Sequence, residues 1–308
     1  MDKLAFVFPG QGSQFVGMLA DHWAVDVVRQ TFEEASTALG FDLQGMVQSG
    51  PAEELNKTEN TQPALLTASV SLWRLWQEKG GVAPVYLAGH SLGEYSALVA
   101  AGVMNFADAV KIVRKRGLFM QEAVPAGTGA MAAILGLDGE KVVGVCAAAA
   151  QGEVVEAVNY NSPGQVVIAG QKEAVDRAVA LAKEAGARKA MPLPVSVPSH
   201  CALMKPAAER LSVELDAVDF SAPEIPVVHN VTADVCADPE QIRANLVQQL
   251  FSPVRWVETI NTLSDAGVAQ FAECGPGKVL AGLNKRIVRK APVALLESAA
   301  AFDELLGA

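Results

Sequence analysis

The chain has 308 residues, enough for one large domain or for a domain that carries a smaller inserted one. Hydrophobic residues make up 51% and charged residues 19% of the chain, a composition that argues against long disordered stretches. The 24 lysines and arginines against 34 aspartates and glutamates give a net charge of -10. Nucleic acid is therefore not expected as the main partner, because phosphate binding normally needs a basic surface.

The four cysteines, Cys146, Cys201, Cys236 and Cys274, are widely scattered. No Cys-x-x-Cys or Cys/His ligand spacing occurs, so neither a structural zinc site nor a disulfide framework is indicated. The first apolar run, Leu4 to Phe8, is shorter than a secretory signal, and no uncharged run reaches the length of a membrane span. We expect a cytoplasmic protein with no metal and no membrane partner.

The first third of the chain alternates short apolar strands with helices. The strands are continuous apolar runs that end at glycine or Pro-Gly, which is typical of buried parallel strands. Strands are predicted over residues 4–8 and 85–88, and helices over 26–39, 63–79, from the turn at 89–93 to 101, and 106–123.

The middle of the chain has a different order of predicted strands and helices. Its predicted order of strand, helix, strand, strand, helix and strand is that of a ferredoxin-like split unit. The strands are predicted at residues 131–135, 154–160, 165–169 and 188–193, and the helices at 139–150 and 173–185. We therefore predict a ferredoxin-like inserted subdomain over 127–196 and a catalytic core formed by 1–126 and 197–308.

The last third returns to alternating elements. A loop at 195–200 and a helix are expected first, then a strand at 227–230, further helices, a strand at 268–273 and a last long helix. Strands and helices that alternate on both sides of an insert predict a mostly parallel sheet between helical layers. The predicted fold class is α/β: an α/β-hydrolase-like core with an inserted ferredoxin-like subdomain.

A nucleophile is predicted in the turn Gly89-His90-Ser91-Leu92-Gly93, between a buried strand and a helix. Glycines two residues before and after a serine let strand and helix pack closely around a strained turn that exposes the hydroxyl. The helix N-terminus adds unpaired N–H groups that favour an oxyanion. The alternative is an ordinary tight turn. His90, inside the turn, is expected to be structural.

A serine nucleophile needs a general base, and histidine is the usual one. Of the four histidines, His200 lies in a loop at the edge of the insert, where catalytic side chains tend to collect. His22 is expected to be exposed, and His229 to be packed in a strand. His200 could instead cap a helix or lie on the surface. Cys201 is a rival nucleophile, but no second elbow surrounds it.

Arg116 is the most informative charged residue. On a helical wheel it falls inside the apolar arc of its helix, between Ile112 and Met120. A buried guanidinium needs an anionic partner. From these residues alone, a structural salt bridge, a side chain that reaches the surface and a bidentate pair with a substrate carboxylate remain open.

Several motifs occur together and in a fixed order along the chain. They are Phe8 to Gln14, Gly89 to Glu94, Arg116, Pro198-Ser199-His200 and Gly275-Pro276-Gly277. This set resembles the malonyl-CoA:acyl carrier protein transacylase family of bacterial fatty-acid synthesis, essentially from end to end. The resemblance implies malonyl transfer from malonyl-CoA to the phosphopantetheine thiol of acyl carrier protein, without a cofactor.

The resemblance also implies roles for matching residues. Ser91 would be the acylated nucleophile and His200 its base, and the backbone carbonyl of Gln249 would orient that histidine. The N–H groups of Gln11 and Leu92 would form the oxyanion hole.

At the other end of the substrate, Arg116 would bind the malonyl carboxylate, and Met120 and Ser199 would line the pocket. Acyl carrier proteins are acidic, so their docking surface should be basic. The candidate residues are Arg188, Lys189, Lys278, Lys285, Arg286, Arg289 and Lys290.

Other functions fit some of the same motifs. The serine elbow is shared with serine esterases and thioesterases, although these usually place their histidine near the C-terminus, and no histidine follows His229 here. A non-catalytic carrier-binding module and a malonyl transferase of polyketide synthesis are the remaining alternatives.

Overall fold

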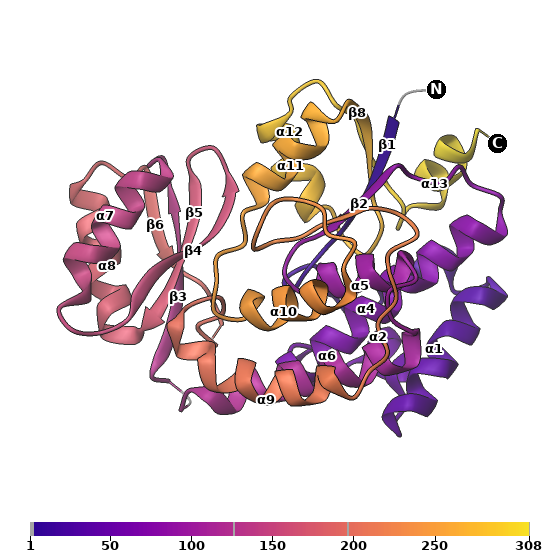
Figure 1. The fold of residues 1–308 in the computed structure, drawn as a ribbon, viewed down its shortest axis with the longest axis horizontal. Coiled ribbons are helices and arrows are strands. Elements are labelled where there is room, and N and C mark those ends of the chain that lie inside the picture. The colour runs from indigo at the N-terminus through magenta and orange to yellow at the C-terminus, as the bar shows by residue number, and fades with distance from the viewer. Residues whose placement is uncertain (1–2, 126, 196, 308) are drawn as a thin grey trace.

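Five short strands form a parallel sheet, sheet A, in a computed structural model that describes residues 3–125, 127–195 and 197–307. Its order is β7-β2-β1-β8-β9, and the four neighbouring pairs are all parallel. The strands are β1 (Lys3–Phe8), β2 (Tyr86–Gly89), β7 (Val227–Val228), β8 (Val268–Glu273) and β9 (Val293–Leu295). The mostly parallel sheet predicted for the core is confirmed (Figure 1).

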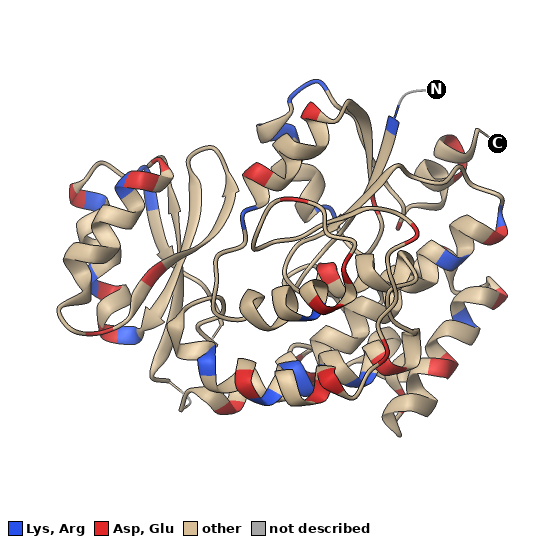
Figure 2. Cartoon of the chain, in the orientation of Figure 1, with Lys and Arg blue, Asp and Glu red and all other residues tan. Residues whose placement is uncertain are grey.

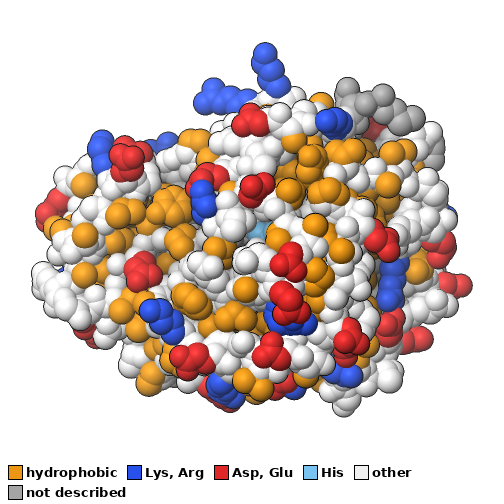
Figure 3. All heavy atoms as spheres, in the orientation of Figure 1, with side chains coloured by type: hydrophobic (Ala, Val, Ile, Leu, Met, Phe, Trp, Pro, Cys, Tyr) orange, Lys and Arg blue, Asp and Glu red, His pale blue; other side chains and the backbone are white. Residues whose placement is uncertain are grey.

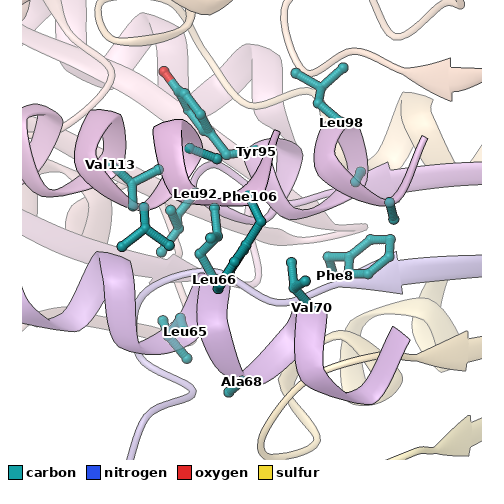
Figure 4. Packing of buried hydrophobic residues seen from close by; sticks show 14 of the residues in the cluster. Phe8, Leu65, Leu66, Ala68, Val70, Leu92, Tyr95, Leu98, Phe106 and Val113 are labelled. Carbon is teal, nitrogen blue, oxygen red and sulfur yellow. The ribbon is translucent and has the colours of Figure 1, made fainter. Parts of the chain in front are cut away.

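Successive side chains of a strand point to opposite faces of a sheet, and helices cover both faces of sheet A. Phe6 and Phe8 of β1 pack on one side with helices α1 (Asp26–Leu39), α4 (Thr58–Glu78), α5 (Gly93–Ala100) and α6 (Phe106–Ala123). Figure 4 shows part of this packing around Phe8, Leu66 and Leu92.

The opposite face of sheet A is covered by α11 (Trp256–Asp265) and α12 (Val279–Ile287), which pack on Ala5 and Val7. The remaining helical elements surround the core. They are η1 (Ala20–His22), α2 (Leu43–Ser49), α3 (Ala52–Leu55), η2 (Ala202–Met204), α9 (Lys205–Asp216), α10 (Pro239–Gln249) and α13 (Ala299–Leu306). None of the helices in the described ranges is long and apolar enough to cross a membrane.

Sheet B is a separate, antiparallel sheet of four strands, in the order β4-β5-β3-β6. It contains β3 (Gly129–Leu135), β4 (Val155–Ser162), β5 (Gln165–Gln171) and β6 (Lys189–Pro192), with helices α7 (Gly139–Ala150) and α8 (Lys172–Glu184). The two helices pack on one face of the sheet (Figure 1). The predicted ferredoxin-like order is confirmed.

The predicted limits of the inserted subdomain fall at residues 126 and 196, which lie outside the described residues, so these limits stay a prediction. Sheet B is joined to the core by backbone pairing as well as by the chain. Tyr160 of β4 donates to the carbonyl of Val254 at 3.0 Å, and Val254 donates to Val158 at 2.9 Å.

Some predicted elements were wrong in extent. Helix α4 begins at Thr58 rather than at Pro63, so Pro63 lies inside a long buried helix, which tolerates its cost. The prediction of one long helix at the end of the chain is also wrong. Helix α12 ends at Ile287, and the apolar segment Val293–Leu295 then pairs with β8 before α13.

His22 is buried, contrary to the prediction that it is exposed. Only 3% of it is accessible, and its Nε2 lies 3.0 Å from the carbonyl oxygen of Leu296. Its ring also packs against Phe302 of α13, with 5.6 Å between ring centres. The reason is a contact between distant segments: the C-terminal part of the chain folds back over η1.

The glycines of the predicted elbow are required by close backbone approach. A Cβ atom on Gly93 would lie 2.0 Å from the carbonyl oxygen of Phe8, and one on Gly89 would lie 1.9 Å from the backbone of Gly93. Strand β1, strand β2 and helix α5 therefore meet at a distance that only glycine allows.

We predict that Gly93→Ala lowers the free energy of unfolding by at least about 2 kcal/mol, because backbone must move to admit the methyl group. Gly144→Ala is the matched control: Gly144 lies in helix α7 with no atom within 4 Å of an added Cβ. It should raise stability by about 0.5–1 kcal/mol through helix propensity. Urea unfolding of both variants measures this, and equal effects would contradict the close approach.

Candidate active site

Ser91 lies between the end of β2 and the start of α5, in a backbone conformation that non-glycine residues rarely adopt (φ 53°). Asn230, in the turn that follows the neighbouring strand β7, holds this elbow. Its Oδ1 accepts from the N–H of Ser91 at 2.7 Å, and its Nδ2 donates to the carbonyl of Gly89 at 2.6 Å. The strained elbow is therefore fixed by a buried side chain that comes from sequence far away.

His200 lies directly beside this hydroxyl, with 2.7 Å between its Nε2 and Ser91 Oγ. Its Nδ1 is 2.7 Å from the backbone carbonyl of Gln249. A carbonyl can only accept, so Nδ1 carries the proton and Nε2 offers a lone pair to the serine O–H. The predicted orienting contact is present, and it leaves His200 in the tautomer of a general base.

Burial, together with the nearby Arg116 cation, lowers the pKa of His200 to about 3. The imidazole is therefore neutral at physiological pH, as a base must be before it accepts a proton. Like Ser91, His200 has a left-handed backbone conformation (φ 67°). Its own N–H donates to the carbonyl of Leu250 at 2.9 Å, which anchors the loop after β6 to the end of α10.

Arg116 reaches the same hydroxyl from helix α6. It is 1% exposed, and its Nη2 lies 3.3 Å from Ser91 Oγ. Nη1 donates to Gln62 Oε1 at 2.8 Å and Nη2 to Gln249 Oε1 at 3.0 Å, and the guanidinium lies 5.5 Å from the centre of the Tyr95 ring. Among the described residues no carboxylate forms an ion pair with it. A buried cation is thus held only by neutral groups.

Gln11 and Leu92 border a cavity of about 450 Å³ together with Ser91, His200 and Arg116. In the described part of the chain, the backbone N–H of neither Gln11 nor Leu92 is used in a protein hydrogen bond. Both amides are therefore unpaired in the described part of the chain, as donors to an oxyanion must be.

Met120 and Ser199 also line this cavity, as the resemblance implies. Met120 is 2% exposed and accepts a hydrogen bond from Gln62 Nε2 at its sulfur, at 3.6 Å. The cavity wall continues onto sheet B, at Met131 and Val167. In the space-filling view, histidine atoms are visible within a hollow near the middle of the molecule (Figure 3).

Cys201, the rival nucleophile, is fully buried, and its Sγ donates to the carbonyl of Pro198 at 3.1 Å. Burial raises the pKa of its thiol to about 12, so it stays protonated and unreactive. His90 contacts Asn161 of β4, with 2.8 Å between Nε2 and Oδ1, and so links the elbow to sheet B. His229 is buried directly after β7, where its Nδ1 lies 2.7 Å from Glu94.

Sequence reasoning missed the polar side chains that support the site. Gln62, Asn230 and the side chain of Gln249 belong to three different elements and have no motif spacing relative to Ser91. Glu94 was visible only as the residue after the second elbow glycine.

Comparison with known proteins identifies the family. The model of the acyl transferase domain family matches residues 5–301. The chain belongs to this family. Among relatives named malonyl CoA-acyl carrier protein transacylase, that of Salmonella typhimurium is 60% identical over 99% of both chains, and that of Escherichia coli K12 is 63% identical over 94% of both.

Solved structures agree with this acyl transferase over nearly its whole length. An acyl carrier protein S-malonyltransferase from Vibrio cholerae is 59% identical, with a TM-score of 0.97 over 98% of this chain and 99% of that one. A malonyl-transacylase solved in complex with its type II PKS acyl-carrier protein is 58% identical, with a TM-score of 0.98 over 99% of both chains. The predicted family and fold class are confirmed.

The acyl transferase offers no cluster of three or more metal-ligating side chains within the described ranges. The basic residues predicted to bind the carrier protein are all exposed. Two of them, Lys285 and Arg286, lie on α12, and this helix also lines the cavity, through Val279, Leu280 and Leu283. Figure 2 shows that acidic residues are spread over the helices of the core, so any basic surface on this face is small.

We predict that Ser91 stays reactive at pH values well below 6.5, the ordinary pKa of histidine. Because the folded pKa of His200 lies near 3, labelling of Ser91 by a fluorophosphonate should change little between about pH 8 and about pH 5. In Arg116→Gln the apparent pKa of His200 should rise but stay below 6.5, since burial, the larger cause of its lowering, remains while the nearby cation is gone.

The lowered pKa of His200 also affects the stability of the fold. Between the folded pKa near 3 and the unfolded value of 6.5, only the unfolded chain binds the proton, so this group makes the fold less stable as the pH falls. A wild-type labelling rate that falls with an apparent pKa near 6.5 would contradict a neutral, buried His200.

Proposed function

We propose that this acyl transferase moves a malonyl group from malonyl-CoA to the phosphopantetheine thiol of an acyl carrier protein, through a malonyl ester on Ser91. The single observation that carries the proposal is the position of Arg116. A buried guanidinium, with no carboxylate paired to it among the residues that the structure describes, lies 3.3 Å from the nucleophilic oxygen, beside the cavity that His200 also lines. This arrangement fits an acyl group that ends in a carboxylate.

In the first half-reaction, Ser91 Oγ attacks the thioester carbon while its proton passes to His200 Nε2, 2.7 Å away. The N–H groups of Gln11 and Leu92 bind the oxyanion, and each such donor typically lowers the barrier by about 3 kcal/mol. The carbon–sulfur bond then breaks. His200 returns its proton to the sulfur, coenzyme A leaves and the malonyl group remains on Ser91.

The second half-reaction runs through the same groups in reverse. The carrier thiol gives its proton to His200 and attacks the ester carbon. The oxyanion forms again at Gln11 and Leu92, and the Ser91 oxygen leaves with the proton from His200. One neutral imidazole therefore serves both steps, and no group outside the chain and its two substrates is needed; we propose that the enzyme works without a cofactor.

Arg116 supplies the binding energy that distinguishes the acyl group. A malonyl carboxylate would give the guanidinium its missing counter-charge, and a bidentate pair would fix the acyl group in one orientation at Ser91. The free Nε of Arg116, buried and unpaired within the described residues, is one available donor. Met120 and Ser199 would then enclose the rest of the acyl group.

A serine thioesterase or esterase is less well supported. Its histidine is usually oriented by a carboxylate, whereas a backbone carbonyl orients His200 here. Polyketide synthesis is a second candidate pathway for the acceptor, since one structural relative was solved with a type II PKS acyl-carrier protein. Malonyl transfer initiates elongation in fatty-acid synthesis and is the same chemistry in both cases.

The remaining expectations follow from this function. The carrier protein would dock on the basic residues of α12, because α12 lines the cavity through which the phosphopantetheine must enter. Residues 127–196 would form the inserted subdomain on the opposite wall. Coenzyme A thioesters and acyl carrier protein belong to the cytoplasm, so the enzyme would act there.

The decisive experiment is to incubate the protein with malonyl-CoA and determine its mass. We expect a stable malonyl adduct on Ser91 that carrier-protein thiol discharges, and no adduct on Ser91→Ala. Rapid release of free malonate would support a hydrolase instead. No adduct and no turnover would leave only a carrier-binding module.

We further predict that Arg116→Ala lowers kcat/KM for malonyl-CoA by roughly 100-fold or more, the loss of a bidentate charged pair, and lowers that for acetyl-CoA far less. The half-life of the malonyl ester should also shorten, because the acyl group loses its fixed orientation. Rapid-quench acylation with both substrates measures these values. Equal losses for malonyl and acetyl groups would refute carboxylate binding by Arg116.

A further inference from the structure

Glu94 is a buried carboxylate one turn from the nucleophile that the mechanism above does not use. It is fully inaccessible, on helix α5. Its Oε1 lies 2.7 Å from His229 Nδ1, and its Oε2 accepts from the N–H of Asn230 at 3.1 Å and from Gln249 Nε2 at 2.8 Å. Within the described residues no lysine or arginine pairs with it, so three N–H donors alone stabilise its charge.

The side-chain amide of Gln249 stands between this anion and the Arg116 cation. Its Oε1 accepts from Arg116 Nη2 at 3.0 Å, while its Nε2 donates to Glu94 Oε2 and to the carbonyl of Ser91 at 3.0 Å. A reversed amide would place its NH₂ against the guanidinium and its oxygen against the carboxylate. Both contacts would then be repulsive, so the two charges fix the orientation of the amide.

We propose that Glu94 is a positioning residue that acts through Gln249 to hold Arg116 over Ser91, and that it thereby helps select acyl groups that end in a carboxylate. This inference rests on the proposed function, in which Arg116 binds that carboxylate. Glu94 touches neither the substrate nor the reacting atoms in this scheme. It acts by keeping the acceptor end of Gln249 turned toward the guanidinium.

An uncharged, apolar side chain at position 94 removes this control. The amide of Gln249 then keeps one of its two acceptors, the Ser91 carbonyl, so its oxygen is held less firmly toward Arg116. When the amide turns, Gln62 is the side-chain amide that still accepts from Arg116. The guanidinium is then free to leave the position over Ser91 that a carboxylate requires, whereas an acetyl group makes no demand on it.

Glu94→Gln is the conservative variant that separates hydrogen bonding from mere packing. Its carbonyl oxygen can still accept from Asn230 and Gln249, while its NH₂ faces His229. His229 can accept that NH₂ at Nδ1 by moving its proton to Nε2, an atom with no partner among the described residues. Glu94→Gln should therefore rescue selectivity that Glu94→Met, of similar size, loses.

The test is the ratio of kcat/KM for malonyl-CoA to that for acetyl-CoA, measured as acylation of Ser91 by mass spectrometry. We expect Glu94→Met and Gln249→Met each to lower this ratio about tenfold or more, as loss of a charge-assisted hydrogen bond implies. The double variant should lower it little further, since both changes break one chain of contacts. Glu94→Gln should stay within about threefold of the wild type.

Glu273→Gln is the matched control, because Glu273 is another fully buried glutamate that accepts backbone N–H groups, from Leu280 and Ala281 of α12. It should leave the ratio unchanged whatever it does to stability. If Glu94→Met does not fold, an unchanged ratio in Gln249→Met still overturns the inference, because the link itself is removed.

Two failures are distinguishable. Equal losses for malonyl and acetyl groups in the position 94 and 249 variants, with a wild-type enzyme that loads malonyl on Ser91, would overturn the positioning role alone. A wild type that forms no malonyl ester would overturn the proposed function and this inference with it.

Discussion

The cation of Arg116 is buried, forms no ion pair with a carboxylate in the described part of the chain, and determines much of how the site is arranged. Two glutamine oxygens and the Ser91 hydroxyl contact it, and the Tyr95 ring lies nearby. Burial of a charge beside neutral groups costs free energy that the fold must supply elsewhere. Burial has the largest share in lowering the pKa of the neighbouring His200 imidazole, and the Arg116 cation lowers it further, so the base is neutral. In the proposed function Arg116 therefore contributes both to carboxylate recognition and to the protonation state of the base.

The elbow shows how a strained backbone is kept in place by groups outside it. Ser91 and His200 both adopt left-handed conformations, which cost free energy for residues with a Cβ. Asn230 holds the first, and the end of α10 holds the second through the carbonyl groups of Gln249 and Leu250. The position of the nucleophile relative to its base is thus determined by sheet A and α10 together.

Local patterns predicted much of this protein. The apolar runs of β1 and β2, the period of α6 and the glycines of the elbow each reflect a constraint that acts within a few residues. The burial of Arg116 was also visible, because its helix has one apolar face. What failed depends on contacts between distant segments: the burial of His22 under the C-terminal segment, the pairing of β9, and the glutamine and asparagine side chains that surround Arg116 and Ser91. A lone Gln or Asn carries no periodic signal, so only the folded chain shows what it binds.

The residues that line the cavity come from two separate parts of the fold, and this separation limits what a substitution in either part can change. Ser91, His200 and Arg116 all come from the core, whereas Met131 and Val167 of sheet B form the facing wall. Sheet B has its own apolar interior, with α7 and α8 on its other side. Substitutions there can reshape the entrance for a different donor or carrier while the bond-making groups stay as they are. The wall that meets the substrate can therefore change independently of the groups that make and break bonds.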